Sequence, residues 1–282
     1  MLWKDSKGIL LMKNNFADLL DKGYCVVKSF LDKENVDLIK QDFELVKNDR
    51  FLNPNFNIMP VGKKIEISKV LLTITELANN VANSTAIITD VGSTPIYFSI
   101  EHGVNFGYHQ DHESWFLYGD HTNYLNIWIP VIKPSIELTN VIVLDAKRLF
   151  QDHPELLFLK GYGATRFEGG NTSYIFDDNT GEKITLNFNL DSYAECPQLA
   201  EGDALIMRGD CIHKTQDTLT SRVAISARRL LTSSIIHKTH FNAASNTKKQ
   251  IIENNPAMYQ KIMSQFTDSD TCTVGGLMAA LK

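Results

Sequence analysis

Residues 201–231 read EGDALIMRGDCIHKTQDTLTSRVAISARRLL, and they carry the clearest evidence for the fold. Two runs of mostly apolar residues, 203–209 and 222–231, are separated by a segment of polar and turn-forming residues. Runs of this length with turn signals between them are typical of strands. The stretch therefore predicts antiparallel β-structure.

The same alternation of short runs and turns extends over about residues 95–232. Further runs are TPIYFSIEH (94–102), NYLNIWIPVI (123–132), NVIVLDA (140–146) and KITLNFNLD (183–191). Strands in this number can close a sandwich or a barrel. Residues 161–183 interrupt them with five glycines and many Asn, Thr and Asp residues. This composition indicates an inserted long loop or mobile hairpin, which we expect to act as a lid over the site.

Helical patterns flank this β-region. Apolar residues recur at helical spacing in 14–23, 31–46 and 68–83, and Asp32 is the candidate N-cap of the second stretch. A polar helix is expected around 247–266. We expect one domain, 1–282, with a helical N-terminal support at 1–90, a β-core at about 91–235, and a C-terminal helix and tail at 236–282.

The composition is that of an ordinary globular protein. Of the 282 residues, 43% are hydrophobic and 22% are charged, and the formal net charge is -5, so no positive field attracts nucleic acid or anionic lipid. The apolar run ILLM near the N-terminus is too short for a signal peptide or a membrane span. The four cysteines form no C-x-x-C pair and are interpreted as reduced, mostly buried thiols. We expect a cytoplasmic protein without nucleic-acid or membrane partners, of unknown oligomeric state.

The best candidates for a metal site lie in YHQDHE. His109 and Asp111 are two residues apart, and on an extended backbone they project to the same side. The same spacing recurs at His153 and Glu155, but in a segment that looks helical or turn-like. A third ligand is offered by His213, in the turn-strand-turn pattern after Gly202. Two imidazoles and one carboxylate are typical of non-haem Fe(II) oxygenases, and the same donor types also suit zinc hydrolysis.

A cation near these ligands favours the oxygenase interpretation. Arg222 begins a strand nine residues after His213, and its planar fork suits the far carboxylate of a dicarboxylate chelator. Thr215 could add a hydroxyl group. Arg228 shares a strand face with Arg222 and is the alternative carboxylate-binding residue.

Four motifs in order resemble the phytanoyl-CoA dioxygenase-like branch of the Fe(II)- and 2-oxoglutarate-dependent oxygenases. They are KGYCVVKSFLDKENVDLIKQDFE (22–44), YHQDHES (108–114), NYLNIWIPV (123–131), and EGDALIMRGDCIHKT (201–215) followed by SRVAIS (221–226). The resemblance spans most of the chain. It implies a mainly β fold with flanking helices, whose core is a double-stranded β-helix, also called a jelly roll or cupin-like core.

The resemblance also implies roles for particular residues. His109, Asp111 and His213 would hold Fe(II), Arg222 and Thr215 would bind the far carboxylate of 2-oxoglutarate, and Trp128 would lie near this co-substrate. The expected reaction consumes O2 and hydroxylates a small-molecule substrate, with release of succinate and CO2. Desaturation or cyclisation from the same site, and a jelly-roll metal protein that is not an oxygenase, are the alternatives.

The sequence departs from the family where NVIVLDAKRLF follows the WIP strand, so the substrate side of the pocket is not carried over. His102, His112, His121, His237 and His240 are interpreted as structural, and Glu113 as an exposed residue or a neighbour of the site. The aromatic residues Trp115, Phe116, Tyr118 and Trp128 would form either core or a lining for an apolar substrate. Arg208, Arg228 and Arg229 are interpreted as surface charges where they have no site role.

Overall fold

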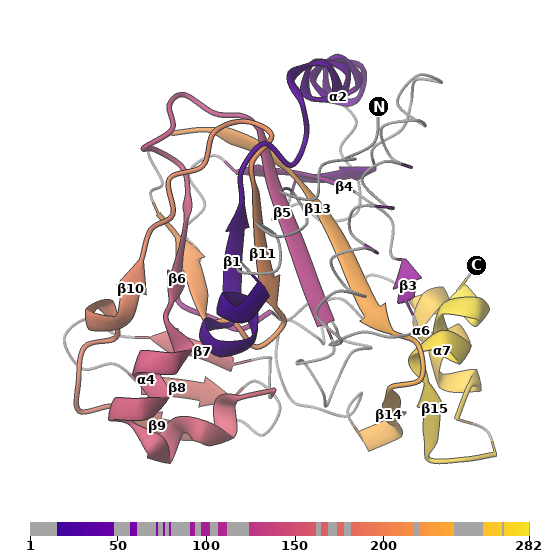
Figure 1. The fold of residues 1–282 in the computed structure, drawn as a ribbon. Coiled ribbons are helices and arrows are strands. Elements are labelled where there is room, and N and C mark those ends of the chain that lie inside the picture. Colours follow the sequence, from indigo (N-terminus) through magenta and orange to yellow (C-terminus); the bar gives the residue numbers. More distant parts are fainter. Residues whose placement is uncertain are drawn as a thin grey trace.

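Two facing β-sheets form the centre of the computed structural model (Figure 1). The residues that the structure describes are 16–47, 57–60, 72, 76, 79, 91–93, 97–101, 107–111, 124–161, 165–168, 174–177, 182–216, 220–239, 256–266 and 268–281. Within these residues no helix is both long and apolar enough to cross a membrane.

The larger sheet has seven antiparallel strands, and its order is β1-β11-β5-β13-β4-β2 with β3 beside β13. The strands are β1 (Tyr24–Val27), β2 (Asn57–Pro60), β3 (Val91–Ser93), β4 (Tyr97–Glu101), β5 (Tyr124–Ile132), β11 (Ala204–Arg208) and β13 (Arg222–Leu231). The strands predicted at 123–132, 203–209 and 222–231 are therefore confirmed. Both β1 and β2 come from before residue 91, so the N-terminal part contributes strands to this sheet as well as helices, and β1 lies in the strand-like run YCVVKSF (24–30).

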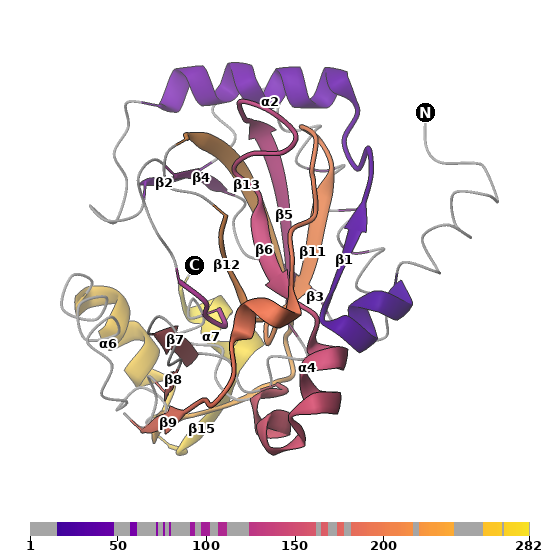
Figure 2. The same ribbon diagram turned by 90° about the vertical axis from the view of Figure 1, so that its left-hand side faces the viewer.

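The smaller sheet faces the larger one and has the order β10-β6-β12. Its strands are β6 (Val141–Leu144), β10 (Ala194–Glu195) and β12 (His213–Thr215). Figure 2 shows β6 and β12 in front of the larger sheet. Side chains from both sheets, among them Trp128, Val143 and Leu205, form one buried cluster between them. The space between the sheets is therefore the interior of a two-sheet barrel.

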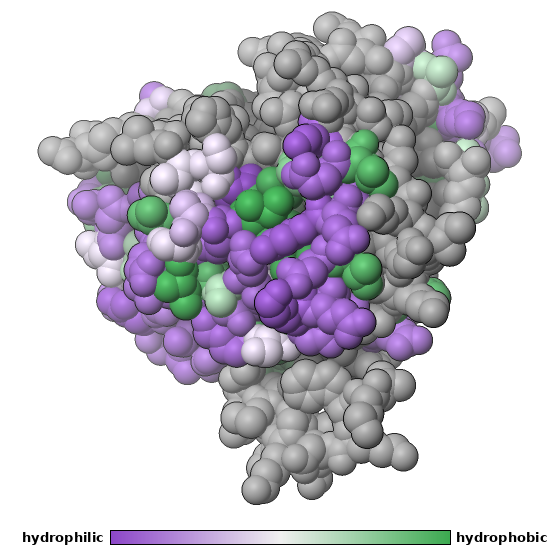
Figure 3. Space-filling view, turned by 90° about the horizontal axis from the view of Figure 1, so that it is seen from above, coloured by the Kyte–Doolittle hydropathy of each residue, from purple (hydrophilic) through white to green (hydrophobic). Residues whose placement is uncertain are grey.

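The opposite face of the larger sheet is covered by helical residues. Helix α2 (Lys33–Val46) begins after Asp32, whose side chain accepts a hydrogen bond from the Asn35 N–H, as the sequence predicts. It lies across one end of the sheet (Figure 2), and Ile39 is fully buried in the cluster that also holds Ile127 of β5. Seen from above, the described surface is mostly hydrophilic with small separate apolar patches (Figure 3).

The insertion at 161–183 contains ordered strands. β7 (Thr165–Glu168), β8 (Tyr174–Asp177) and β9 (Lys183–Thr185) form a three-stranded antiparallel sheet. Phe167 and Ile175 are buried in a core cluster, and the Phe167 N–H donates to the Tyr108 carbonyl oxygen over 2.8 Å. The described strands thus pack beside the segment that leads into His109. The strand predicted over 183–191 is shorter than expected, because the chain turns into the 3-10 helix η3 (Leu190–Tyr193), where the Asn189 side chain accepts from the Asp191 N–H.

Shorter elements complete the two ends of the barrel. α4 (Ala146–Asp152) and η2 (Pro154–Leu159) pack beside η3, and the C-terminal part forms β14 (Ile235–His237), β15 (Thr271–Thr273), α6 (Pro256–Ser264) and α7 (Val274–Leu281). Ile236, Phe266 and Leu277 are buried together with Tyr124 of β5. The small-residue tail therefore packs on its own chain. The helix predicted over 247–266 is described from Pro256 onward.

Candidate metal centre

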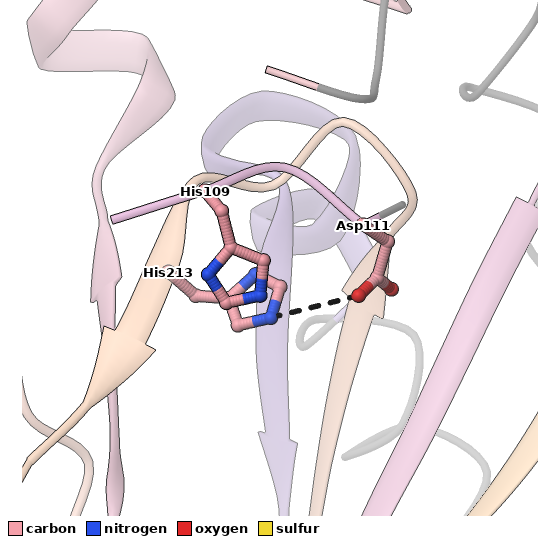
Figure 4. Close-up of side chains that lie close together, drawn as sticks. All are labelled: His109, Asp111 and His213. Atoms are coloured by element: carbon pink, nitrogen blue, oxygen red, sulfur yellow. Dashed lines mark ion pairs between the residues drawn. The ribbon is translucent and has the colours of Figure 1, made fainter. Parts of the chain in front are cut away.

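His109, Asp111 and His213 meet at one end of the barrel interior. Each offers one ligand atom, and these atoms all lie within 4.8 Å of one another. The two histidines face each other across an antiparallel bridge, in which each N–H donates to the other's carbonyl oxygen over 2.9 Å. The Asp111 Oδ1 lies 3.7 Å from the His213 Nε2 (Figure 4). The backbone bridge thus holds His109 and His213, which are widely separated in the sequence, as direct cross-strand neighbours.

Backbone carbonyl groups select the tautomer of both imidazoles. The His109 Nδ1 lies 2.8 Å from the Gly107 oxygen, and the His213 Nδ1 lies 2.9 Å from the Cys211 oxygen. A carbonyl oxygen only accepts, so each Nδ1 carries the proton and each Nε2 keeps its lone pair. Second partners of this kind orient histidine ligands in metal sites. The two rings and the carboxylate therefore fit a divalent metal ion such as Fe(II).

A buried network fixes the segment that carries His109 and Asp111. Gln110, which lies between them, is fully buried, and its Nε2 donates to the Leu159 and Asp210 carbonyl oxygens over 2.7 and 2.9 Å. The Asp210 carboxylate in turn binds Arg208 through two hydrogen bonds of 2.8 and 2.9 Å. The turn before His213 is thus tied directly to the segment that holds the other two candidate ligands.

The thiol of Cys211 lies beside this turn. Burial raises the pKa of the thiol well above its ordinary range, and the charge of Asp210 adds to the effect. The group therefore stays protonated, and a protonated thiol is a poor metal ligand.

Arg222 lies on the same interior face, farther along the barrel. Its Nη1 donates to the Thr139 and Asn140 carbonyl oxygens over 2.7 and 2.9 Å, and its guanidinium carbon lies 4.9 Å from the centre of the Trp128 ring. Thr215 is buried on the same side of β12 as His213. The structure thus brings together Arg222 and Trp128, and it places Thr215 on the strand that begins at His213.

Arg228 points into the same interior but at another position. It lies six residues after Arg222 on β13, roughly 20 Å along an extended strand. Its Cα pairs with that of Asn126, whose Nδ2 lies 3.4 Å from the Asp111 Oδ2. Arg228 therefore lies near the metal end of the barrel.

The interpretation of Arg208 and Arg229 as surface charges is wrong. Arg208 is buried against Asp210, and its Nη1 also donates to the Leu20 carbonyl oxygen over 2.6 Å. Arg229 is fully buried, and its Nε donates to the Asn79 Oδ1 over 3.0 Å. Both partners, Leu20 and Asn79, are distant in the sequence, so the local pattern gave no sign of them.

His153 lies between α4 and η2, so its segment is helical or turn-like as the sequence predicts. Its ring stacks on Phe188, with ring centres 3.5 Å apart, and its Nδ1 lies 3.1 Å from a Glu155 carboxylate oxygen. Trp115, Phe116, Tyr118 and Glu113 lie outside the described residues. Sequence reasoning missed Gln110 and Asn126, although a single amide in the apolar run YLNIW was a visible signal for the latter.

Solved structures with similar folds are found across most of the chain. The non-heme alpha ketoglutarate dependent epimerase SnoN from nogalamycin biosynthesis aligns with a TM-score of 0.53 and 12% identity, over 82% of this chain and 87% of that one. The alpha ketoglutarate dependent carbocyclase SnoK from the same biosynthesis gives 0.52 and 12%, over 78% and 84%. EvdO2 from Micromonospora carbonacea var. aurantiaca gives 0.51 and 14%, over 77% and 90%.

This chain has a jelly-roll core. The predicted fold class is therefore confirmed, because the two facing sheets and the flanking helices are arranged as in these proteins. No family model matches the sequence, and no curated protein matches it either. The phytanoyl-CoA dioxygenase-like branch in particular stays a prediction.

Proposed function

We propose that this protein is an Fe(II)- and 2-oxoglutarate-dependent oxygenase that hydroxylates a small molecule. The observation that carries the proposal is the pairing of two features on one interior surface. His109, Asp111 and His213 offer three ligand atoms at one end, and the buried Arg222 lies over Trp128 farther along. A protein that only stored a metal, or hydrolysed a substrate at zinc, would need the three ligands but not the cation.

The residues of this chain would each have a defined task. The Nε2 atoms of His109 and His213 and the carboxylate of Asp111 would hold Fe(II) and leave other coordination positions open. The guanidinium of Arg222 would bind the far carboxylate of 2-oxoglutarate, with the Thr215 hydroxyl as a second donor and Trp128 as an apolar wall. When bound, iron and 2-oxoglutarate would supply the activation of O2 for oxidation of a substrate C–H bond, with release of succinate and CO2.

Proteins of this fold support the proposal without naming the substrate. A structure of the epimerase SnoN, which is 12% identical to this chain with a TM-score of 0.53, holds Fe3+, alpha ketoglutarate and nogalamycin RO. Epimerisation and carbocyclisation are the activities of SnoN and SnoK, so product analysis has to separate hydroxylation from desaturation or ring closure.

An anaerobic titration tests the proposal. We expect a weak visible charge-transfer band when 2-oxoglutarate is added to the protein with Fe(II), and no band with either addition alone. The His213→Ala protein is the matched control and should give no band. Tight binding of Zn(II) or Mn(II) without any effect of 2-oxoglutarate would favour a metal protein that is not an oxygenase.

The product distinguishes hydroxylation from halogenation. As a metal ligand, Asp111 would occupy the position that a chloride ion needs, so turnover in chloride should give products heavier by one oxygen and without a chlorine isotope pattern. Products lighter by two hydrogens would indicate desaturation or cyclisation. A chlorinated product would show that Asp111 does not bind the metal.

A further inference from the structure

Asn126 is a buried amide with an incomplete set of hydrogen bonds. It lies on β5 and is 4% exposed, and its Nδ2 lies 3.4 Å from the Asp111 Oδ2. Its Oδ1 is buried and accepts no hydrogen bond in the described part of the chain. A buried acceptor without a donor lowers stability, so such a group calls for an explanation.

A second buried asparagine shows what a purely structural amide looks like in this fold. Asn140 is fully buried, and its Oδ1 accepts from the Lys133 Nζ and the Leu199 N–H over 2.6 and 3.2 Å. Its Nδ2 donates to the Ile136 carbonyl oxygen over 3.0 Å. Both ends of this amide are therefore satisfied by the protein itself.

The position of Asn126 suits a role at the metal site better than a purely structural role. The Nδ2 approaches Oδ2 of Asp111, whereas Oδ1 of the same carboxylate is the oxygen nearer to the His213 Nε2. One carboxylate oxygen is thus directed to the amide and the other to the His213 imidazole. This arrangement favours binding of a metal ion by Asp111 through one carboxylate oxygen only.

We propose that Asn126 is a positioning residue of the metal site, which holds the second oxygen of Asp111 and accepts, at its own Oδ1, a hydrogen bond from water on the metal. The inference rests on the metal site of the proposed function. In the metal-free protein the Oδ1 lacks a donor, so Asn126 reduces the stability of that form and increases the affinity for the ion.

The variants Asn126→Leu and Asn140→Leu test this proposal, because they replace a buried amide by an apolar side chain of similar size. Thermal unfolding of the metal-free proteins and binding of Co(II) by calorimetry are the two measurements. Asn126→Leu should unfold at the wild-type temperature or above it, and should bind Co(II) about tenfold to a hundredfold more weakly. Asn140→Leu should unfold at a lower temperature and keep its Co(II) affinity.

The visible spectrum of bound Co(II) adds a measurement that a structural role would not change. Removal of the amide should alter the spectrum, because Asp111 is then free to bind through both oxygens. Wild-type affinity and spectrum in Asn126→Leu, and in Asn126→Ala if the larger side chain does not fit, would overturn the proposal. Wild-type protein that binds no Co(II) would instead overturn the metal site on which it rests.

Discussion

The two faces of the larger sheet are both buried, yet they differ in chemistry. The outward face contacts α2 through apolar side chains, as Ile127 and Ile206 illustrate. The inward face of the same strands carries Asn126, Ser226 and Arg222, each of which is 4% exposed. Because burial of polar groups lowers stability unless partners compensate, the apolar outward face contributes stability, whereas the polar residues of the inward face are those to which we assign binding in the proposed function. Alternation along a strand places these two kinds of side chain one residue apart.

The sharpest test of this separation compares one residue of the inner site with one of the outer face. His213→Ala should weaken binding of Fe(II) by more than about a hundredfold, because it removes a direct ligand, and should abolish turnover. Ile127→Ala should leave metal affinity unchanged but lower the free energy of unfolding by about 2 to 5 kcal/mol. Metal titration and denaturant unfolding of both variants measure the metal affinity and the free energy of unfolding. If both variants changed these two quantities equally, the two faces would not have separate roles.

Within the inner face, Arg222 and Arg228 should differ. Arg222→Ala removes the proposed buried partner of the co-substrate carboxylate, and loss of such a pair costs about 2 to 5 kcal/mol, so the KM for 2-oxoglutarate should rise well over tenfold. Arg228→Ala, six residues along the same face, should change this KM much less. Steady-state assays at varied 2-oxoglutarate concentrations give the KM of each variant. A larger increase in Arg228→Ala than in Arg222→Ala would assign the carboxylate-binding role to Arg228.

A smaller effect is expected at Gln110, which faces neither the outer core nor the metal. Gln110→Ala leaves the Leu159 and Asp210 carbonyl oxygens without their donor and loosens the segment between His109 and Asp111. Metal affinity should fall about tenfold, as for other residues that orient ligands. A matched control is Gln216→Ala, whose side chain contacts the 137–140 loop and should leave metal affinity unaltered. Unchanged affinity in Gln110→Ala would show that the turn and the ligand segment are held independently.

The smallest expected effect is a change with pH in the affinity for 2-oxoglutarate, at the end of the barrel that holds Arg222. Burial and the nearby charge of Arg222 lower the pKa of Lys133 to about 8, and the other charged or titratable groups that act on it are Cys196, Asp203 and Glu137. Lys133 is charged below this pH and neutral above it, so 2-oxoglutarate should bind a few-fold more weakly as the pH rises from about 7 to about 9.

Lys133→Met should remove this dependence on pH. Calorimetric titration of the Mn(II) protein with 2-oxoglutarate gives the dissociation constant at each pH. An identical pH profile in Lys133→Met and wild-type protein would exclude Lys133 as the titrating group.

Local patterns predicted much of this fold. The strands around 124–132, 204–208 and 222–231 and the cap at Asp32 were predictable, because their signals lie within the segments themselves. The sequence also placed His109, Asp111 and His213 as candidates. The burial of Arg229 was not predictable, since its contact with Asn79 depends on a distant part of the chain, and Arg208 adds a distant contact with Leu20 to its local pair with Asp210. Gln110 was missed because its partners Leu159 and Asp210 are also distant, whereas the lone amide of Asn126 in an apolar run was a visible signal that was overlooked.

The bridge between His109 and His213 has a consequence for synthesis. These residues are 104 positions apart, from 213 minus 109, and they pair directly only when the smaller sheet has closed. Contacts of such long sequence separation form late, because the loop-closure entropy must be overcome first. A growing chain that ends before His213 would hold only two of the three proposed ligands. At the proposed site, iron would therefore bind only after the barrel is complete.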